Sequence, residues 1–279
     1  MTTHTLNTTA NATGTTTTNT EHSRRTAVRA RRIPMRRIVA VELRKSFDTR
    51  AGLWLLASVA GASLLTTGAV IAWGPDEDFT YATFTTTIAF PMSVILPIIA
   101  ALAVTAEWTQ RSGLTTFTIV PHRSRIMAAK AIGLALVAVP ATALAFIVGA
   151  GGNVVASWIS GNDTVWDQDL VAVPYVLLSL TLTLAMGLVC GTLIRNSAGA
   201  IVAFFIFSFV IPPLLGLLAM TQDWFHDLQP WVDLDYQLTA LLRGSFGTEQ
   251  WSQLATTTGI WLVLPAVVGM WTLVRSEVK

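Results

Sequence analysis

Six long stretches of the chain contain no charged residue, and they alternate with segments that carry almost all of the charge. Each stretch is at least 25 residues long, and they cover 51–75, 79–106, 131–162, 170–194, 196–222 and 250–274. A helix needs about 20 apolar residues to cross a bilayer core of about 30 Å. The apolar runs are continuous rather than alternating, which favours helices over barrel strands.

The pattern therefore predicts an all-α membrane protein with six transmembrane helices, near 53–73, 84–106, 128–150, 170–193, 199–219 and 254–274. Composition agrees, because only 12% of the 279 residues are charged and the mean hydropathy is +0.57. A soluble domain carries about a quarter charged residues. The single cysteine, Cys190, lies in the fourth predicted span and cannot form a disulfide within the chain.

The charged residues are sorted between alternate loops. Of the 18 Lys and Arg residues, 17 lie before span one, between spans two and three, between spans four and five, or after span six, and Arg243 is the exception. Eleven of the 16 acidic residues lie in the other loops. By the positive-inside rule, both termini are cytoplasmic and the chain is a multi-pass protein of the cell (plasma) membrane. The net charge of +2 therefore reflects membrane polarity and does not indicate nucleic acid binding.

The segment before the first span has two parts. Residues 1–32 form a Thr/Asn-rich and then basic cytoplasmic tail, which we expect to be disordered and to contact anionic membrane lipids. Residues 33–279 form the six-span domain. At its start, residues 35–47 predict an amphipathic interfacial helix, with Met35, Val39, Leu43 and Phe47 on one stripe.

The outer loops predict two local structures. Residues 151–169 open with Gly151-Gly152-Asn153, which is typical of a turn, and contain a second turn at 160–163. The last outer loop, 220–253, is the longest. Four leucines at helical spacing predict a short surface helix there, and they are Leu234, Leu238, Leu241 and Leu242.

Signals for catalysis are missing from the sequence. It contains no phosphate-binding GxxxxGK[ST] loop, no HExxH and no CxxC, so we predict no catalytic, cofactor or metal residues and no enzyme activity in this chain. No Asp, Glu or Arg lies in the core of a predicted span, and Lys130 lies at the end of one. Proton-coupled carriers usually need such groups within the bilayer. Energy for uphill transport would therefore come from outside the bilayer, although sodium coupling through carbonyls and hydroxyls stays open.

Polar and proline residues within the spans suggest two further features. The Pro212–Pro213 pair in span five is the best candidate for a hinge. Hydroxyls at 85–87, 179, 181 and 183 could line a path, but bonds to carbonyls of their own helices are the favoured interpretation.

The segment between spans two and three is longer than a turn needs. It reads EWTQRSGLTTFTIVPHRSRIMAAK, from Glu107 to Lys130. Pro121 interrupts it and a helix restarts at Arg123 and continues into span three. The segment predicts a short cytoplasmic element between two membrane helices. It is either a positively charged topology signal or a docking element for a soluble partner.

The pattern E-x3-R-x-G-x7-P-x-R-x-R-x4-K in this segment resembles the second-to-third-span loop of ABC-2 type permeases of ABC transporters. Residues 41–56, VELRKSFDTRAGLWLL, resemble the interfacial "elbow" helix and the first span of that family. The six-span layout and the long last outer loop are similar too. The resemblance covers about residues 33–279.

The resemblance implies a function. Such permeases form half of a dimeric pore, with a second copy or a sister permease as partner, and most are exporters. A separate ATPase subunit binds the ATP and docks on the inner loop. Gly113–Pro121 would then approximate the coupling element, and the docking site would comprise Glu107, Arg111, Gly113, Leu114, Phe117, Pro121, Arg123, Arg125 and Lys130. The alternatives are a stand-alone secondary carrier and an accessory or structural membrane subunit.

Overall fold

Every regular element in the described part of the chain is helical. The computed structural model describes residues 34–47, 50–109, 123–243 and 246–275; it is 89% helix, and no strand occurs within those ranges. The predicted all-helical class is therefore confirmed. The predicted tail at 1–32 lies outside the described residues.

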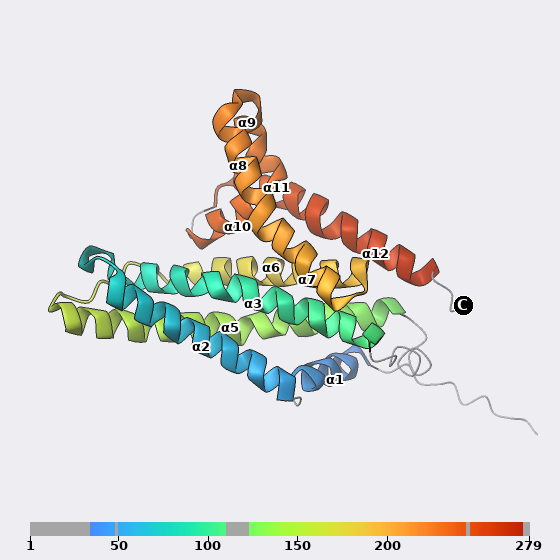
Figure 1. The fold of residues 1–279 in the computed structure, drawn as a ribbon, viewed down its shortest axis with the longest axis horizontal. Coiled ribbons are helices and arrows are strands. Elements are labelled where there is room, and N and C mark those ends of the chain that lie inside the picture. The colour runs from blue at the N-terminus through green and yellow to red at the C-terminus, as the bar shows by residue number, and fades with distance from the viewer. Residues whose placement is uncertain (1–33, 48–49, 110–122, 244–245, 276–279) are drawn as a thin grey trace, which may run out of the picture. The chain divides into compact units, whose positions relative to one another are not determined.

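Figure 1 shows the helices labelled in chain order. In chain order they are α1 (Met35–Phe47), α2 (Arg50–Trp73), η1 (Asp76–Asp78), α3 (Tyr81–Thr109), α5 (Arg123–Ser160), α6 (Ala172–Ile194), α7 (Ser197–Phe205), η2 (Ile206–Val210), α8 (Ile211–Thr221), α9 (Asp223–Val232), α10 (Leu234–Leu242), α11 (Thr248–Thr258), η3 (Gly259–Val263) and α12 (Leu264–Arg275).

Within the described residues, five helical stretches are long and apolar enough to cross a membrane. They are Tyr81–Ala106, Ala128–Ser160, Ala172–Ile194, Ser197–Thr221 and Thr248–Thr272, and they match predicted spans two to six. The chain thus has the character of a multi-pass membrane protein. The first predicted span corresponds to α2, whose described apolar part is the shorter stretch Ala57–Trp73.

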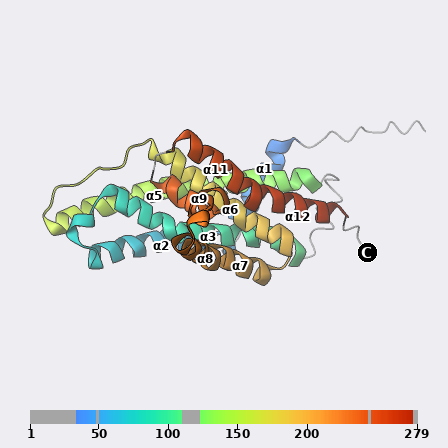
Figure 2. The same ribbon diagram turned by 90° about the horizontal axis from the view of Figure 1, so that it is seen from above.

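Four helices, α2, α3, α5 and α6, lie side by side and share one core (Figures 1 and 2). Large apolar side chains from α3 and α6, including Ile88, Leu96 and Leu184, are buried between them. Small residues bring the helix backbones close together. At Gly187 of α6, a Cβ atom would overlap the carbonyl group of Pro97 in α3. This glycine permits the close approach of α3 and α6.

Helix α5 is longer than predicted. It runs through residues 151–153 without interruption, so the turn predicted there is wrong. Two glycines of this region, Gly149 and Gly152, lie close against neighbouring helices instead. A Cβ at Gly149 would lie 2.9 Å from Thr85 Oγ1, and one at Gly152 would lie 2.6 Å from Thr67 Cγ2. The helix ends at the second predicted turn, where Gly161 has a φ of +74°.

The connection after α5 returns to the start of α3. Val165 O accepts hydrogen bonds from Tyr81 N at 3.1 Å and from Asn153 Nδ2 at 2.9 Å. Asp167 Oδ1 accepts from Ala82 N at 2.8 Å and so satisfies one of the unpaired amides at the beginning of α3. These bonds fix the ends of α3 and α5 that lie away from α1.

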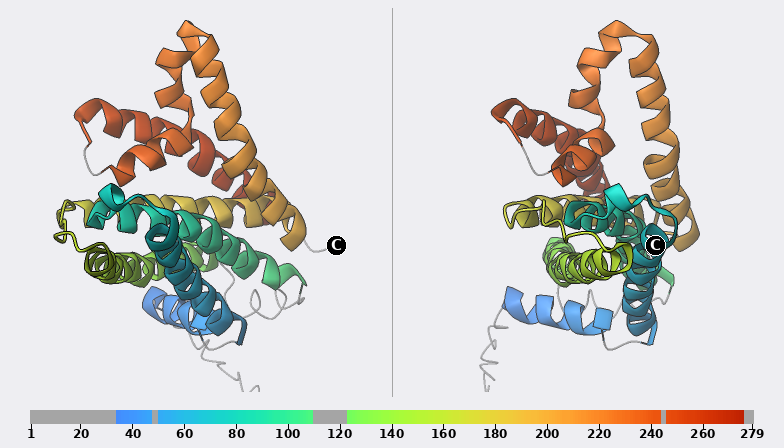
Figure 3. Two further views of the ribbon diagram at one scale, coloured as in Figure 1. Left: turned by 60° about the vertical axis from the view of Figure 1, so that its left-hand side comes forward. Right: turned by 90° about the vertical axis from the view of Figure 1, so that its left-hand side faces the viewer.

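The last third of the described chain leaves this bundle. The stretch from α7 through η2 to α8 begins beside α3 and α6 and then rises away from them, and α11 through α12 returns at an incline (Figures 1 and 3). Helices α9 and α10 connect the two stretches. Helix α10 packs back against α6 and α11.

Candidate functional site

Segments that the sequence places on the inner side meet at one end of the structure. Helix α1, the end of α3, the start of α5, the α6–α7 turn and the end of α12 lie at the same end (Figure 1). Ile38 and Val39 of α1 are buried against Ala129 of α5, while Arg36 and Arg37 are exposed. The predicted helix at 35–47 is therefore present, with an apolar face on the bundle and arginines on its surface.

Among the predicted docking residues, Lys130 has a side chain that the structure describes. It is 5% exposed, and its Nζ donates to Ala103 O of α3 at 3.1 Å. Ala103 lies one helical turn before Glu107. The start of α5 is thus fastened to the end of α3. The Lys130 side chain contributes to packing at this junction rather than to an exposed surface.

The other predicted docking residues are only partly visible. Glu107 lies in the last turn of α3, and Arg123 and Arg125 lie in the first turn of α5, but their side chains are not among those described. The residues between these helices lie outside the described chain, and they include Arg111, Gly113, Leu114, Phe117 and Pro121. Docking at Gly113–Pro121 therefore stays a prediction.

The α6–α7 turn is tied to its neighbours by polar contacts. Arg195 has a φ of 55°, and its Nη2 donates to Thr272 Oγ1 of α12 at 2.9 Å. The hydroxyls of Ser197 in α7 and Thr105 in α3 lie 2.8 Å apart. These contacts join three helices at the same end as Lys130. Sequence reasoning identified Arg195 only as a topology signal, because its partner is 77 residues away.

The predicted hinge at Pro212–Pro213 coincides with a change of helix type. The preceding turn, η2, is a π-helix, and Ile211 N donates five residues back to Ile206 O. Neither proline has an N–H to donate, and each ring crowds the carbonyl four residues earlier. A wider turn before the pair relieves that crowding. The π-turn accommodates the proline pair, and a hinge there stays a prediction.

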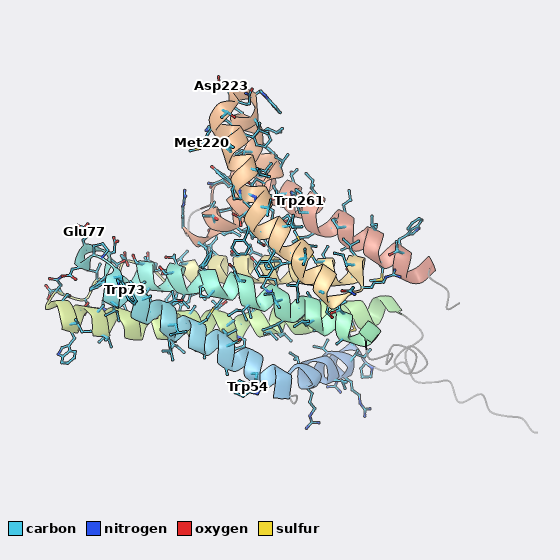
Figure 4. The ribbon with its side chains drawn as sticks, viewed as in Figure 1. Trp54, Trp73, Glu77, Met220, Asp223 and Trp261 are labelled. Carbon is cyan, nitrogen blue, oxygen red and sulfur yellow. The ribbon has the colours of Figure 1, made fainter. Side chains whose placement is uncertain are left out.

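Sequence reasoning missed a second such turn in the last span. The π-helix η3 ends two residues before Pro265, and Leu264 N donates to Gly259 O. The two π-turns are in contact, because the rings of Phe207 in η2 and Trp261 in η3 pack edge to face with centroids 5.0 Å apart. Trp261 lies between the two inclined stretches (Figure 4).

Hydroxyl groups within the bundle mostly bond to their own helix, as favoured from the sequence. The hydroxyls of Thr85, Thr86 and Thr87 donate to carbonyls three or four residues earlier, as do those of Thr181 and Thr183. Ser179 differs, because its Oγ donates to Leu238 O of α10 at 3.3 Å. That bond ties α10 to the bundle.

The helix predicted at 234–242 is present as α10. Leu234, Leu238 and Leu241 form its buried face against α6 and α11, while Tyr236 and Thr239 are exposed on the other face. Leucine spacing alone could not tell which neighbours cover the apolar face. Trp261 Nε1 also donates to Val232 O, just before α10, at 2.7 Å.

Two acidic residues mark the start of α10. Asp233 is buried, and its two carboxylate oxygens accept from Tyr236 N at 3.2 Å and from Gln229 Nε2 at 3.0 Å. Burial, together with the nearby negative charge of Asp233, raises the pKa of Asp235 to about 6.

Titratable residues are scarce in the described part of the spans. In the five candidate spans of the described chain, the charged residues are Lys130 and Glu249, and both lie near the end of a span. No group of three His, Cys, Asp or Glu residues that could hold a metal occurs in the residues described.

Comparison with known proteins gave no match, either to a family model or to a curated protein sequence.

Proposed function

We propose that this chain is the membrane-spanning permease subunit of an ABC transporter, of ABC-2 type in architecture, and that a separate ATPase powers it from the cytoplasmic side. The observation that carries the proposal is the junction between Lys130 and Ala103. It fastens the two helices that flank residues 110–122 at the end where α1 and the α6–α7 turn also lie. A force applied to that segment would act on α3 and α5 together.

The proposal includes a sixth span, formed by α2. Trp54 and Trp73 near its two ends are 76% and 84% exposed (Figure 4). They lie 19 residues apart, which corresponds to about 29 Å along a helix and about the thickness of a bilayer core. Exposed tryptophans at this spacing suit the two membrane interfaces. Helix α1 would then lie along the inner interface, with its arginines near anionic lipid headgroups.

The proposed orientation can be tested by labelling. In a Cys190→Ala background, a cysteine replacing Glu77 should react with a membrane-impermeant maleimide on intact cells. A cysteine replacing Arg37 should react only after permeabilisation. Both residues are exposed and lie at opposite ends of the α1–α2 region. Labelling of the Arg37 position on intact cells would contradict an inner location of α1.

The proposed partners are an ATPase subunit and a second permease, either another copy or a sister chain. Exposed apolar side chains on α8, including Leu214, Leu217 and Met220, support a further helical neighbour or lipid along that face. The direction of transport is proposed as export, because the sequence resemblance is to exporters. The return of α10 towards α6 is also similar to the short outer helices of that family.

The deciding experiment is co-purification with an ABC ATPase encoded beside this chain. We expect the two to purify together and the permease to change the ATPase rate. Replacing Gly113–Pro121 by a flexible Gly-Ser segment of equal length should abolish that change without unfolding the chain. The matched control replaces nine residues of the Thr-rich stretch 2–20 in the same way. If no ATPase associates, or if coupling survives the loop replacement, a secondary carrier or an accessory subunit becomes the better assignment.

A further inference from the structure

The π-turn η2 in span five leaves backbone carbonyls without hydrogen-bond donors. Ile211 N donates to Ile206 O across the turn, and the proline pair that follows has no N–H to donate. The next amide, Leu214 N, belongs to the carbonyl of Val210, which is the N-cap of α8. The turn therefore leaves three consecutive carbonyls, at 207–209, without a donor from their own helix.

These carbonyls lie far from both ends of the span. Ser208 is 11 residues after Ser197 and 13 before Thr221, or about 16 Å and 20 Å along a helix. No other hydrogen bond reaches the three carbonyls from the described part of the chain, where Ser208 is half-buried and Phe209 is exposed. At membrane depth, unpaired carbonyls are tolerated where protein buries them or where they line a water-filled cavity.

A hollow of about 190 Å³ lies beside this turn. It is bounded on one side by Pro212, whose missing N–H leaves Ser208 O unpaired, and on the other by α9 and α10. Its volume is enough for several water molecules. The polar residues of its wall are Gln229, Asp233, Asp235, Tyr236, Thr239 and Arg243.

The acidic residues of this wall lie level with the middle of span six. Trp261 is near the midpoint of Thr248–Thr272, and its Nε1 donates to Val232 O at 2.7 Å. The chain therefore enters α10 at that depth, and Asp233 and Asp235 follow directly. Ionised side chains at the depth of a bilayer core face protein or a water-filled cavity rather than lipid.

Water satisfies the turn better than a second copy of the chain would. In a symmetric contact, span five of the second copy would bring one side-chain donor to the middle of the span, the hydroxyl of its own Ser208, for three carbonyls. Each water molecule carries two donors and fits an irregular space. Water is therefore the occupant that these groups favour.

We propose that a water-filled vestibule extends from the outer surface, between α8 and α10, to the middle of span five, and that it admits cations and hydrogen-bond donors in preference to anions. The free carbonyls only accept, and the wall of the hollow carries two acids, Asp233 and Asp235, against one base, Arg243. The inference rests on the proposed orientation and transport function, in which the vestibule is the outer part of the solute path.

Charged methanethiosulfonate reagents applied to intact cells test the vestibule, because they stay outside the bilayer and react with ionised thiols in water. In a Cys190→Ala background, single cysteines replace Ser208 at the turn and Thr239 on the wall of the hollow. Leu214→Cys is the matched control, since Leu214 lies at a similar depth but is 59% exposed and outside the hollow. A trimethylammonium reagent should modify Ser208→Cys and Thr239→Cys at least about tenfold faster than Leu214→Cys, where lipid suppresses thiol ionisation.

The preference for cations is measured at Ser208→Cys, at about pH 8, where the Asp235 carboxyl is ionised. The rates of the trimethylammonium reagent and of a sulfonate reagent are each divided by the rate with a small free thiol. The corrected ratio should favour the cation about threefold or more. Asp235→Asn should remove most of that preference, because it leaves one acid and one base on the wall.

The vestibule is wrong if Ser208→Cys reacts no faster than Leu214→Cys, or if it instead forms a disulfide between two copies. Equal corrected rates for the two reagents would overturn the preference for cations. If Ser208→Cys does not reach the membrane, Thr239→Cys against Leu214→Cys decides between water and lipid. These reactions need no ATPase, and labelling at Glu77 and Arg37 checks the orientation separately, so a failure here is distinguishable from a failure of the proposed function.

Discussion

The bundle of α3, α5 and α6 and the inclined stretches from α7 to α12 are built from similar apolar sequences but are packed very differently. Within the chain, 44%, 39% and 50% of the most apolar window is buried in α3, α5 and α6. The corresponding shares are 6% for Ser197–Thr221 and 22% for Thr248–Thr272. Hydrophobicity therefore predicts that a helix enters the membrane but not how much protein surrounds it there, since lipid tails are as apolar as leucine.

Different contacts hold the two regions. In the bundle, glycine and alanine let backbones approach, as at Gly187 against Pro97. In the inclined region, a few specific contacts join the elements, among them Phe207 with Trp261 and Trp261 Nε1 with Val232 O. We therefore expect substitutions that add volume to destabilise the bundle. Substitutions that remove a single polar contact should cost more stability in the inclined region than in the bundle.

The largest difference in stability is expected when a glycine is replaced by alanine in each of the two regions. Gly187→Ala in α6 forces a Cβ onto the Pro97 carbonyl and should destabilise the fold by about 3 kcal/mol or more. Gly216→Ala in α8 meets open space and should be neutral or stabilise by up to about 1 kcal/mol. Thermal unfolding and the monodisperse fraction in detergent measure both. If the two variants were equally stable, the bundle and the inclined region would not differ in how tightly their helices pack.

The second comparison uses leucine. Leu184→Ala removes a buried side chain from the bundle and should cost about 2–5 kcal/mol. Leu214→Ala on the exposed face of α8 should cost less than about 0.5 kcal/mol in the isolated chain. Unfolding in mixed micelles measures the costs. A larger loss for Leu214→Ala only when a second permease is bound would show that this face is an interface.

A smaller effect concerns the pH dependence of the free energy of unfolding. The folded-state pKa of Asp235 is raised from about 3.8 to about 6, so the folded protein holds more protons than the unfolded chain between these values. Stability should therefore fall as pH rises from about 4 to 6 and stay level above that. Asp235→Asn should flatten this dependence and raise stability at pH 7 by about 1–2 kcal/mol, allowing for solvent screening. Unfolding temperatures from pH 4 to 8 test it. Thr239→Val, a change on the same helix without a charge, is the control and should keep the slope.

The smallest effect isolates one hydrogen bond in the inclined region. Trp261→Phe keeps an aromatic ring beside Phe207 but removes the donor to Val232 O, at a cost of about 0.5–1.5 kcal/mol. Trp158→Phe, in an exposed position near the end of α5, should cost less. Chemical denaturation compares the two. A cost for Trp261→Phe no greater than that for Trp158→Phe would show that the contact contributes nothing measurable.

Length and apolar character made the helices predictable from the sequence, because a bilayer leaves few other ways to pair backbone groups. The Gly151–Asn153 segment was misread for a specific reason. A glycine that permits a turn also permits close helix packing, and for Gly152 only the neighbouring side chains of Thr67 and Phe84 distinguish the two. Likewise, helical leucine spacing identified α10 but not the neighbours, α6 and α11, that cover its leucines.

The functional regions were less accessible from the sequence. The Lys130–Ala103 contact joins residues 27 positions apart and the Arg195–Thr272 contact joins residues 77 apart, with no motif to link either pair. The π-turn before Pro265 depends on the local register of hydrogen bonds rather than on residue type. The proline pair at 212–213 could be noticed only because its missing donors are visible in the sequence itself.

The length of α5 has a mechanical consequence. Its candidate span of 33 residues, Ala128–Ser160, extends about 50 Å, whereas a bilayer core is about 30 Å thick. Tilting alone would require an angle of about 53°, beyond the usual range of 0–40°. A thin bilayer would therefore strain α5 and a thick one would relieve it. On the proposed mechanism, α5 begins where the ATPase acts. The thickness of the surrounding lipid and the hydrolysis of ATP would therefore both change the tilt of this helix.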